Sequence, residues 1–241
     1  MNRPDSHPHA IRSLLLSAMK TGEYSSCAHL PPEKELSEAL HISRTQLRDA
    51  LAALEREGFI TRRHGIGTII NHHVLSIPCR MDIETEFLDM IRQSGFTPDL
   101  AFVRASEECA DARTAERLSL APGSKVLRLC RLCTADGKPA VYCEDIVPFD
   151  LIHTNFSSED LQQPIFPFLQ QFCSRLPHLD VTDLRPVIAD EFLAALFQIP
   201  AGSPLLYMDE TDYDADGLPV FISSQYFVDG IFRHTAIRKR F

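Results

Sequence analysis

The amino-acid sequence predicts an α+β protein with two domains, and three observations support this prediction. A stretch of about 40 residues near the N-terminus has the pattern of two helices followed by a β-hairpin. Two segments about 80 residues apart repeat a pattern of helix, turn, strand, turn and strand. Charge divides the chain similarly, because residues 1–72 hold 9 Lys and Arg against 8 Asp and Glu, and residues 73–241 hold 15 against 25. We therefore expect a domain at 1–72, a linker at 73–82 and a domain at 83–241 with different partners.

The first domain begins with helices whose ends are marked by proline and glycine. Apolar residues at helical spacing predict a helix that starts at Pro8 and stops at Gly22. Pro31 and Pro32 open a second helix, and Gly58 ends a third. The first of these helices is expected to support the other two from behind.

The third helix carries the most informative pattern in the chain. Ser43 is a typical N-cap, and Gln46 completes a capping box three residues later. The apolar side chains recur at helical spacing and form one stripe: Leu47, Ala50, Leu51 and Leu54. Arg44, Thr45 and Arg48 fall outside this stripe, so they are expected at the exposed N-terminal end. In helix-turn-helix proteins that end of the second helix enters the DNA major groove, so the pattern predicts a winged helix-turn-helix.

A short hairpin, the wing, is predicted to follow at residues 59–63 and 68–71. The intervening Gly65-Ile66-Gly67 could be mistaken for a phosphate-binding loop, but it joins two strands and no helix follows, which favours a hairpin tip. Arg62, Arg63 and His64 are candidate phosphate contacts, and solvated charge is an equally good interpretation of each. The acidic second domain would repel DNA, so only the first domain is expected to face it.

The remaining bulk features predict a cytoplasmic protein. No apolar run is long enough to cross a bilayer, and the first ten residues lack the apolar core of a signal peptide. Seven cysteines at irregular spacing fit reduced thiols better than a disulfide framework. His72-His73 suggests a metal site, but adjacent residues of an extended chain point to opposite sides, so no metal is expected there.

The second domain is predicted to form one continuous antiparallel sheet with helices on a face. The repeated units start at Asp111 and Asp190, and each contains an Ala-Asp-Gly turn followed by proline two residues after the glycine. Shorter patterns predict helices at 84–94 and 166–172 and strands at 101–106 and 181–185.

Two groups of residues in this domain resemble metal sites. Cys130 and Cys133 form a CxxC pair, but three residues apart on a strand they point to opposite faces. Five acidic residues at the second hairpin are a candidate cation site or, as we favour from the sequence, a solvated edge that discourages aggregation: Asp209, Glu210, Asp212, Asp214 and Asp216.

The motifs resemble those of a known family. LPPEKEL and ISRTQLRDALAALEREGFITRRHGIGT closely resemble the DNA-binding domain of GntR-family transcriptional regulators. RQSGFTPD, RLSLAPGSKVLRLCRL, DGKPAVYCEDIVP and DGLPVFISSQYFVDGIFR resemble the UTRA effector-binding domain of the HutC-like branch, which has a chorismate-lyase-like fold. The resemblance implies DNA contacts around the capped helix and the wing tip: Lys34, Ser43, Arg44, Thr45, Arg48, His64 and Gly65.

The resemblance also implies an effector pocket, with departures from the family pattern. Arg131 matches the first residue of an Arg-x-Arg pair, but Cys133 stands where the second arginine is usual. Glu86 and Leu88 replace small hydroxyl residues, which argues against an ordinary sugar phosphate. Candidate effector contacts are Glu86, Phe87, Arg131, Cys133, Glu144, Phe221 and Tyr226. An anionic or zwitterionic metabolite fits Arg131 and Glu86, for example an amino acid, an aminophosphonate or a catabolic intermediate; alternatively, a buried Arg131 pairs with Glu144 or Asp145.

The sequence therefore predicts a ligand-responsive transcription regulator, most often a repressor, without a cofactor or enzymatic activity. It is expected to bind a pseudo-palindromic operator as a homodimer, with the effector between the two repeat units. One alternative is a DNA-binding protein whose C-terminal domain only dimerises. A less favoured alternative is an enzyme with a regulatory head, for which the sequence offers no nucleophile–base pair, metal spacing or cofactor loop.

Overall fold

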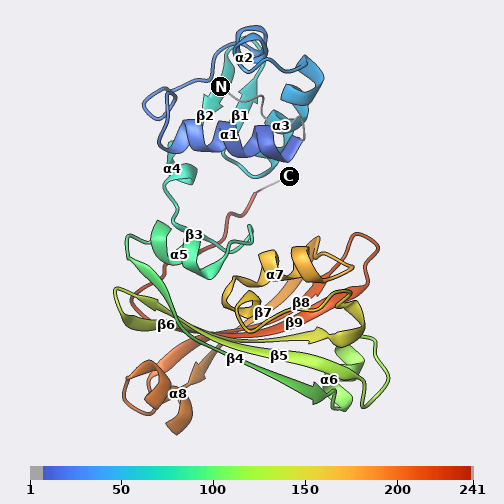
Figure 1. Cartoon of the computed structure of the whole chain (residues 1–241). Coiled ribbons are helices and arrows are strands. Elements are labelled where there is room, and N and C mark those ends of the chain that lie inside the picture. The colour runs from blue at the N-terminus through green and yellow to red at the C-terminus, as the bar shows by residue number, and fades with distance from the viewer. Residues whose placement is uncertain (1–7, 240–241) are drawn as a thin grey trace. The chain divides into compact units, whose positions relative to one another are not determined.

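The computed structural model describes residues 8–239, and this part of the chain divides into two compact units (Figure 1). The first unit contains the chain up to Asp82 together with a return segment that begins at Thr235. The second unit is Ile83–His234. This division differs from the expected one, which gave the whole stretch from residue 83 onward to the second domain. None of the described helices is long and apolar enough to span a membrane.

Three helices make up the core of the first unit: α1 (Pro8–Lys20), α2 (Glu33–Ala39) and α3 (Arg44–Arg56). α1 and α3 contact each other and bury apolar side chains at helical spacing: Ile11, Leu15, Met19, Leu47, Leu51 and Leu54. Arg12 of α1 donates from Nε to both carboxylate oxygens of Glu57, at 2.7 and 2.9 Å. The first helix therefore holds α3 from behind, as expected.

The wing consists of strands β1 (Ile60–Arg63) and β2 (Gly67–Ile70), which pair antiparallel. Gly65 and Gly67 have φ values of +76° and +102° at the tip, a region that strongly favours glycine. The prediction of a hairpin tip in place of a phosphate-binding loop is confirmed.

The stretch between the two predicted domains forms regular structure. It contains α4 (His72–Leu75) and β3 (Cys79–Arg80), and β3 pairs with β10 (His234–Thr235) of the returning chain. Beyond β10, Lys239 donates from Nζ to the carbonyl oxygens of Glu55 and Arg56 at the end of α3, at 2.9 and 2.6 Å. A cation at the C-terminal end of a helix is stabilised by the helix dipole. Both the outgoing and the returning chain are thus attached to the first unit.

The second unit is built on one six-stranded antiparallel sheet in the order β4-β5-β6-β9-β8-β7. The strands are β4 (Pro98–Cys109), β5 (Lys125–Ala135), β6 (Lys138–Pro148), β7 (Leu179–Ile188), β8 (Pro204–Tyr213) and β9 (Pro219–Val228). The β5–β6 and β8–β9 hairpins of the two repeats meet where β6 pairs with β9. The predicted continuous antiparallel sheet is confirmed, and β7 and β4 are its edges.

Helices cover both faces of this sheet, whereas the sequence predicted helices on one face (Figure 1). α5 (Phe87–Gln93) and α7 (Ile165–Phe172) pack on one face, named here the α5/α7 face. α6 (Ala112–Arg117) and α8 (Glu191–Phe197) pack on the other, the α6/α8 face. Two short 3-10 helices, η1 (Phe149–Leu151) and η2 (Asp160–Gln162), precede α7.

The internal repeat is visible in the backbone as well as in the sequence. Asp111 caps α6 by accepting from Thr114 N at 2.7 Å, and Asp190 caps α8 by accepting from Leu193 N at 2.8 Å. The turns after these helices also match, with Gly123 and Gly202 in the left-handed region at +82° and +83°. The two hairpin turns differ, because the first has two residues, 136–137, and the second is a five-residue loop, 214–218.

Candidate nucleic-acid interface and ligand pocket

The N-terminal end of α3 has the cap that the sequence predicts. Ser43 Oγ accepts from Gln46 N at 3.2 Å, and Gln46 Oε1 accepts from Ser43 N at 3.0 Å. This reciprocal pair satisfies donors that an isolated helix leaves unbonded, so it fixes where α3 begins.

Three of the proposed DNA contacts stand on this helix end and are exposed: Arg44, Thr45 and Arg48. Arg48 donates from Nε to Glu33 Oε2 of α2 at 2.7 Å, although its side chain is 66% exposed. An exposed ion pair is worth little free energy. Arg48 is therefore held in a defined position, yet it can exchange Glu33 for another acceptor at small cost.

The other proposed DNA contacts are exposed as well. Lys34 lies in the first turn of α2, and His64 and Gly65 form the tip of the wing. Arg62 differs from its neighbours, because its backbone and side-chain nitrogens donate to Glu55 at 2.8 Å. Arg62 thus fastens the wing to α3, which makes it a poorer candidate for a phosphate contact than the sequence suggested.

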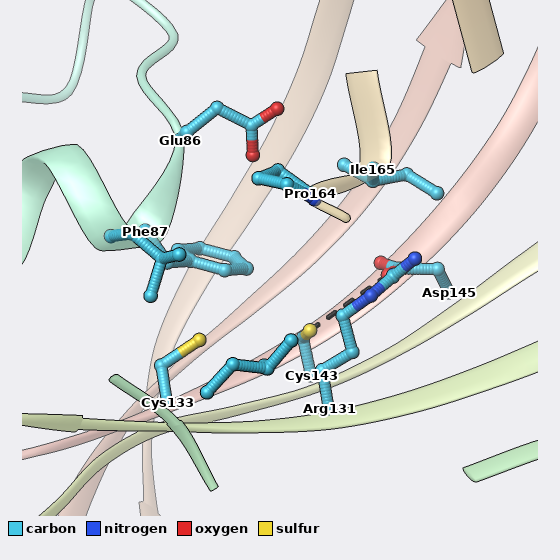
Figure 2. Close-up of a pocket in the computed structure, with 10 residues that line it drawn as sticks. Glu86, Phe87, Arg131, Cys133, Cys143, Asp145, Pro164 and Ile165 are labelled. Carbon is cyan, nitrogen blue, oxygen red and sulfur yellow. Dashed lines mark hydrogen bonds and ion pairs between the residues drawn. The ribbon is translucent and has the colours of Figure 1, made fainter. Parts of the chain in front are cut away.

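A small cavity lies between α5, the start of α7 and strands β5 and β6 (Figure 2). It leaves only about 20 Å³ in which the centre of a water molecule can move. Its walls are mostly apolar, with one guanidinium and two carboxylates among the lining residues: Glu86, Phe87, Leu88, Leu100, Arg131, Cys133, Cys143, Asp145, Pro164 and Ile165. No lining residue comes from the second repeated unit, so the cavity does not lie between the two repeats as expected.

Arg131 and Asp145 form a buried ion pair beside this cavity. Arg131 Nη1 donates to Asp145 Oδ2 at 2.5 Å, and Ser223 Oγ donates to Asp145 Oδ1 at 2.7 Å. Burial raises the pKa of Asp145, and Arg131 opposes that shift. Within the described chain, Nε and Nη2 of Arg131 have no hydrogen-bond partner. These two N–H groups form the side of the guanidinium that binds a carboxylate or phosphate with two parallel bonds.

Glu86 provides the second charged group near the cavity. Its Oε1 atom accepts from Phe166 N in the first turn of α7 at 3.1 Å. Burial raises the pKa of Glu86 to about 7, against the lowering effects of that hydrogen bond and of Arg131. A carboxyl group with such a pKa can exchange its proton near neutral pH when a charged ligand enters.

Four of the seven predicted effector residues line the cavity together, namely Glu86, Phe87, Arg131 and Cys133. Glu144 and Tyr226 lie on the α6/α8 face, where Glu144 accepts from Arg128 at 3.0 Å and Tyr226 packs on Tyr142. Phe221 is buried in the core under α7. Their assignment to this cavity is therefore corrected. The pairing of β5 with β6 puts Asp145, and not Glu144, on the face of Arg131, and Tyr226 shares the face of Glu144. Phe221 does share the face of Arg131, but it packs against Phe166 in the core under α7.

The structure adds pocket residues that the sequence did not single out: Cys143, Pro164 and Ile165. Cys143 lies directly opposite Arg131 in the β5–β6 register, but a β-bulge between Cys133 and Thr134 sets this pairing, so counting from the turn would have pointed to Tyr142 instead. Pro164 and Ile165 come from a distant segment, and no local pattern connects them with β5.

A row of polar side chains crosses the middle of the α5/α7 face and starts at this ion pair. Gln225 Nε2 donates to Ser223 Oγ at 3.3 Å and to Glu210 Oε1 at 3.1 Å. Thr182 Oγ1 donates to Glu210 Oε2 at 3.0 Å. The row therefore links Arg131 on β5 with Glu210 on β8 through side-chain hydrogen bonds.

The acidic residues of β8 are not the solvated edge that the sequence suggested. β8 lies between β9 and β7, and Glu210 and Asp212 are buried on the α5/α7 face. Asp209, on the opposite face, pairs with Arg117 at 2.6 Å. The prediction was wrong because it placed this strand at the sheet edge, which local sequence does not determine.

The cysteines agree with the sequence interpretation. All seven are free, and Cys130 and Cys133 pack into cores on opposite faces of the sheet. His72 lies in α4 with its Nε2 atom 2.8 Å from the carbonyl oxygen of Cys27.

A winged helix-turn-helix joined to a sheet domain with a charged pocket defines a class of DNA-binding regulators that carry a ligand domain. Two family descriptions match the chain: "Bacterial regulatory proteins, gntR family" over residues 9–70 and "UTRA domain" over residues 93–233. The UTRA match spans more than half of the chain. The protein belongs to the GntR-family transcriptional regulators that carry a UTRA domain.

Two relatives from Bacillus subtilis align with most of this chain. Over 215 residues the chain is 24% identical to the regulator YurK of Bacillus subtilis, covering 88% of this chain and 87% of that protein. It is 25% identical over 214 residues to the repressor NagR of the same species, covering 87% and 85%. These relatives are regulators and not enzymes, which confirms the prediction of a non-enzymatic protein.

Solved structures show the same fold. The regulator YydK of Bacillus subtilis superposes with a TM-score of 0.75 at 17% identity, covering 95% of this chain and 99% of that one. PhnF of Mycobacterium smegmatis superposes with a TM-score of 0.60 at 21% identity, with the same coverage.

Proposed function

We propose that this regulator is a ligand-controlled repressor that acts as a homodimer. The exposed, capped end of α3 supports DNA recognition by Arg44, Thr45 and Arg48 in the major groove. His64 and Gly65 at the wing tip reach the adjacent minor groove, and Lys34 contacts phosphate as a point charge. The relative NagR is named as a repressor, which supports the negative sign of regulation.

Replacing Arg48 with Ala tests the DNA contact. The operator is first selected from random duplex DNA, and affinity is then measured by fluorescence anisotropy at fixed salt. Arg48→Ala should weaken operator binding at least about tenfold, because a bidentate base contact is worth roughly 1–3 kcal/mol. Arg56→Ala, at the other end of the same helix, removes the same charge and should leave affinity nearly unchanged. Equal affinities of wild type and Arg48→Ala would refute the assignment.

The effector is proposed to be a small anionic or zwitterionic metabolite. The observation that carries this proposal is the buried guanidinium of Arg131, whose Nε and Nη2 atoms have no partner within the described chain. An effector carboxylate, phosphate or phosphonate would supply the missing acceptors. Glu86, which lines the same cavity, would bind an effector amine. Aminophosphonates and amino acids combine these two groups.

Calorimetric titration with 2-aminoethylphosphonate, glutamate and inorganic phosphate tests the pocket. At least one probe should bind, and Arg131→Lys should weaken it, because lysine keeps the charge but loses the two parallel bonds. Arg104→Lys on the exposed side of β4 is the matched control. A probe that binds both variants equally well would exclude Arg131 as its contact.

The homodimer is supported by the edge strand β7 and the adjacent helix α8. Their exposed apolar side chains are unusual for a free edge: Leu179, Val181, Leu184, Ile188 and Phe192, at 44–66% exposure. A groove of about 400 Å³ with mostly apolar walls also runs beside the end of β7. Pairing of this region with a second copy would bury it and set the spacing of two recognition helices.

The small size of the cavity favours a second candidate function for the C-terminal domain. The cavity has a volume of only about 20 Å³, so it must open before any effector enters. The alternative is a C-terminal domain that only dimerises. A thermal-shift screen in which amino acids, phosphonates, sugar phosphates and carboxylates all leave the melting temperature unchanged would favour this alternative.

A further inference from the structure

A second group of charged residues on the α5/α7 face is separate from the cavity around Arg131. It consists of Glu84, which precedes α5, and Glu210 and Asp212 of β8. One carboxylate oxygen from each residue can be chosen so that all three lie within 4.8 Å of one another. Within residues 8–239, none of the three side chains forms an ion pair with a basic residue. The cluster therefore gathers three carboxyl groups without a basic partner.

Asp212 makes this cluster different from an ordinary solvated patch. The residue is completely buried, at 0% exposure, and in the described chain its carboxylate oxygens accept no hydrogen bond from an N–H group or a neutral hydroxyl, with the carboxyl group of Glu210 beside them. Glu210 beside it accepts from Gln225 and Thr182. Burial and mutual repulsion raise the pKa of Glu84, Glu210 and Asp212. Burying a carboxylate without any partner is costly, so the site lacks a positively charged group.

We propose that Glu84, Glu210 and Asp212 form a binding site for a hard divalent cation, Mg²⁺, Mn²⁺ or Ca²⁺. The donor set consists only of carboxylate oxygens. Hard divalent cations prefer oxygen ligands, whereas zinc sites usually contain the softer nitrogen and sulfur ligands. Oxygens around such an ion at about 2.0–2.6 Å are separated by at most roughly 5 Å, which agrees with the spacing of the cluster.

The surroundings supply access and support for such an ion. Glu84 is exposed while its two partners are buried, so the ion can enter from solvent past Glu84. Thr182 holds Glu210 at 3.0 Å and Asp180 at 2.7 Å, which orients the buried ligand from behind. A bound cation would fasten the segment before α5, where the second unit begins, to strand β8 of its sheet.

Metal titration of the full chain after chelator treatment tests this site. MgCl₂, MnCl₂ and CaCl₂ are added at constant ionic strength, with binding followed by calorimetry and stability by thermal unfolding. At least one cation should bind once per chain and raise the melting temperature. Asp212→Asn should weaken it at least about tenfold, since even indirect supports of metal ligands contribute that much.

Asp183→Asn is the matched control, because Asp183 is an exposed acid on the opposite face of neighbouring β7. It should bind the cation as wild type does. Glu84→Gln, at the exposed mouth, provides a second test that does not disturb the core. Absence of binding by all three cations at millimolar concentration would overturn the proposal. Wild-type affinity in both Asp212→Asn and Glu84→Gln would do the same. In either case a proton shared between Asp212 and Glu210 would explain the buried carboxylates.

Discussion

Arg131 and Asp145 depend on each other because neither charge is exposed to water. Their side chains are 4% and 2% exposed, so removal of one leaves the other unpaired in the core. Arg131→Leu should lower the free energy of unfolding of the second unit by about 3–5 kcal/mol. Urea unfolding of the full chain followed by tyrosine fluorescence reports this change, since the chain has no tryptophan and four of its five tyrosines lie in this unit.

Arg128 offers the comparison on the same strand. It faces the α6/α8 side, pairs with Glu108 and Glu144 at 2.9 and 3.0 Å, and its side chain is 30% exposed. Arg128→Leu should therefore cost roughly 1 kcal/mol or less. If Arg131→Leu and Arg128→Leu lowered the free energy of unfolding equally, burial could not be the cause of the larger loss expected for Arg131→Leu.

If Arg48 contacts DNA as proposed, Glu33 is the side chain that competes for it. Glu33→Gln removes the ion pair at 2.7 Å, so Arg48 no longer has to leave a carboxylate when DNA binds. We expect the operator affinity to rise by up to about fivefold, since exposed pairs are worth roughly 0.2–1 kcal/mol. Anisotropy titration measures this gain. Glu35→Gln, two residues further along α2, shows how much of the gain in operator affinity comes from the loss of a negative charge alone. A gain of the same size in Glu35→Gln would argue against competition between Glu33 and DNA.

At the residue scale, the candidate pocket residues came from the resemblance to the UTRA domain and not from a pattern within the chain itself. Arg131, Cys133, Glu86 and Phe87 meet at the cavity, as the resemblance implied. The partner of Arg131 remained open between Glu144 and Asp145, because the choice depends on the register of β5 with β6. That register is set by the tight turn at residues 136–137 together with a β-bulge between Cys133 and Thr134, which shifts the pairing by one residue. The sequence suggests the turn but gives no sign of the bulge.

Helix α3 shows how a local signal determines an element. Its capping box and apolar stripe are both contained in 12 successive residues, 43–54, so they could be recognised without tertiary information. Ser43→Ala removes the acceptor for Gln46 N and should destabilise the first unit by about 0.5–2 kcal/mol. Hydrogen exchange of α3 peptides, followed by mass spectrometry, detects the loss. Ser13→Ala, an exposed position inside α1, should be neutral or slightly stabilising.

Strand β8 shows the opposite case. Its acidic residues suggested a solvated edge, yet the strand pairs with β9 on one side and β7 on the other. Which strand occupies an edge depends on the order of the whole sheet, and residues 179–188 provide the actual edge. The burial of Asp212 could not be read from its neighbours in the sequence.

For the whole molecule, the internal repeat was the most informative pattern. It predicted two similar hairpins in one antiparallel sheet, and the structure joins them through β6 and β9. It did not predict the placement of helices on both faces, because the segments that contain α5 and α7 lie outside the repeated units.

The proposed dimer makes a prediction at this scale. Val181→Lys combined with Ile188→Lys places charges on the exposed apolar edge of β7, where the two side chains are 57% and 66% exposed. We expect the double variant to sediment as a monomer and to lose the tight binding to a two-half-site operator while keeping single-half-site affinity. Leu218→Lys in the β8–β9 loop is the control. A dimer that persists in the double variant would place the interface elsewhere.

The return of the chain to its first unit has a consequence for protein engineering. Chimeras of such regulators can be made by fusing the DNA-binding domain of one protein to the ligand-binding domain of another at a single point in the linker. Such a graft would leave behind β10 and Lys239, which pair with β3 and bond the end of α3. A complete transplant therefore exchanges two pieces, residues 1–82 and 235–241, and a graft of the first piece alone would pair a foreign tail with the recognition helix.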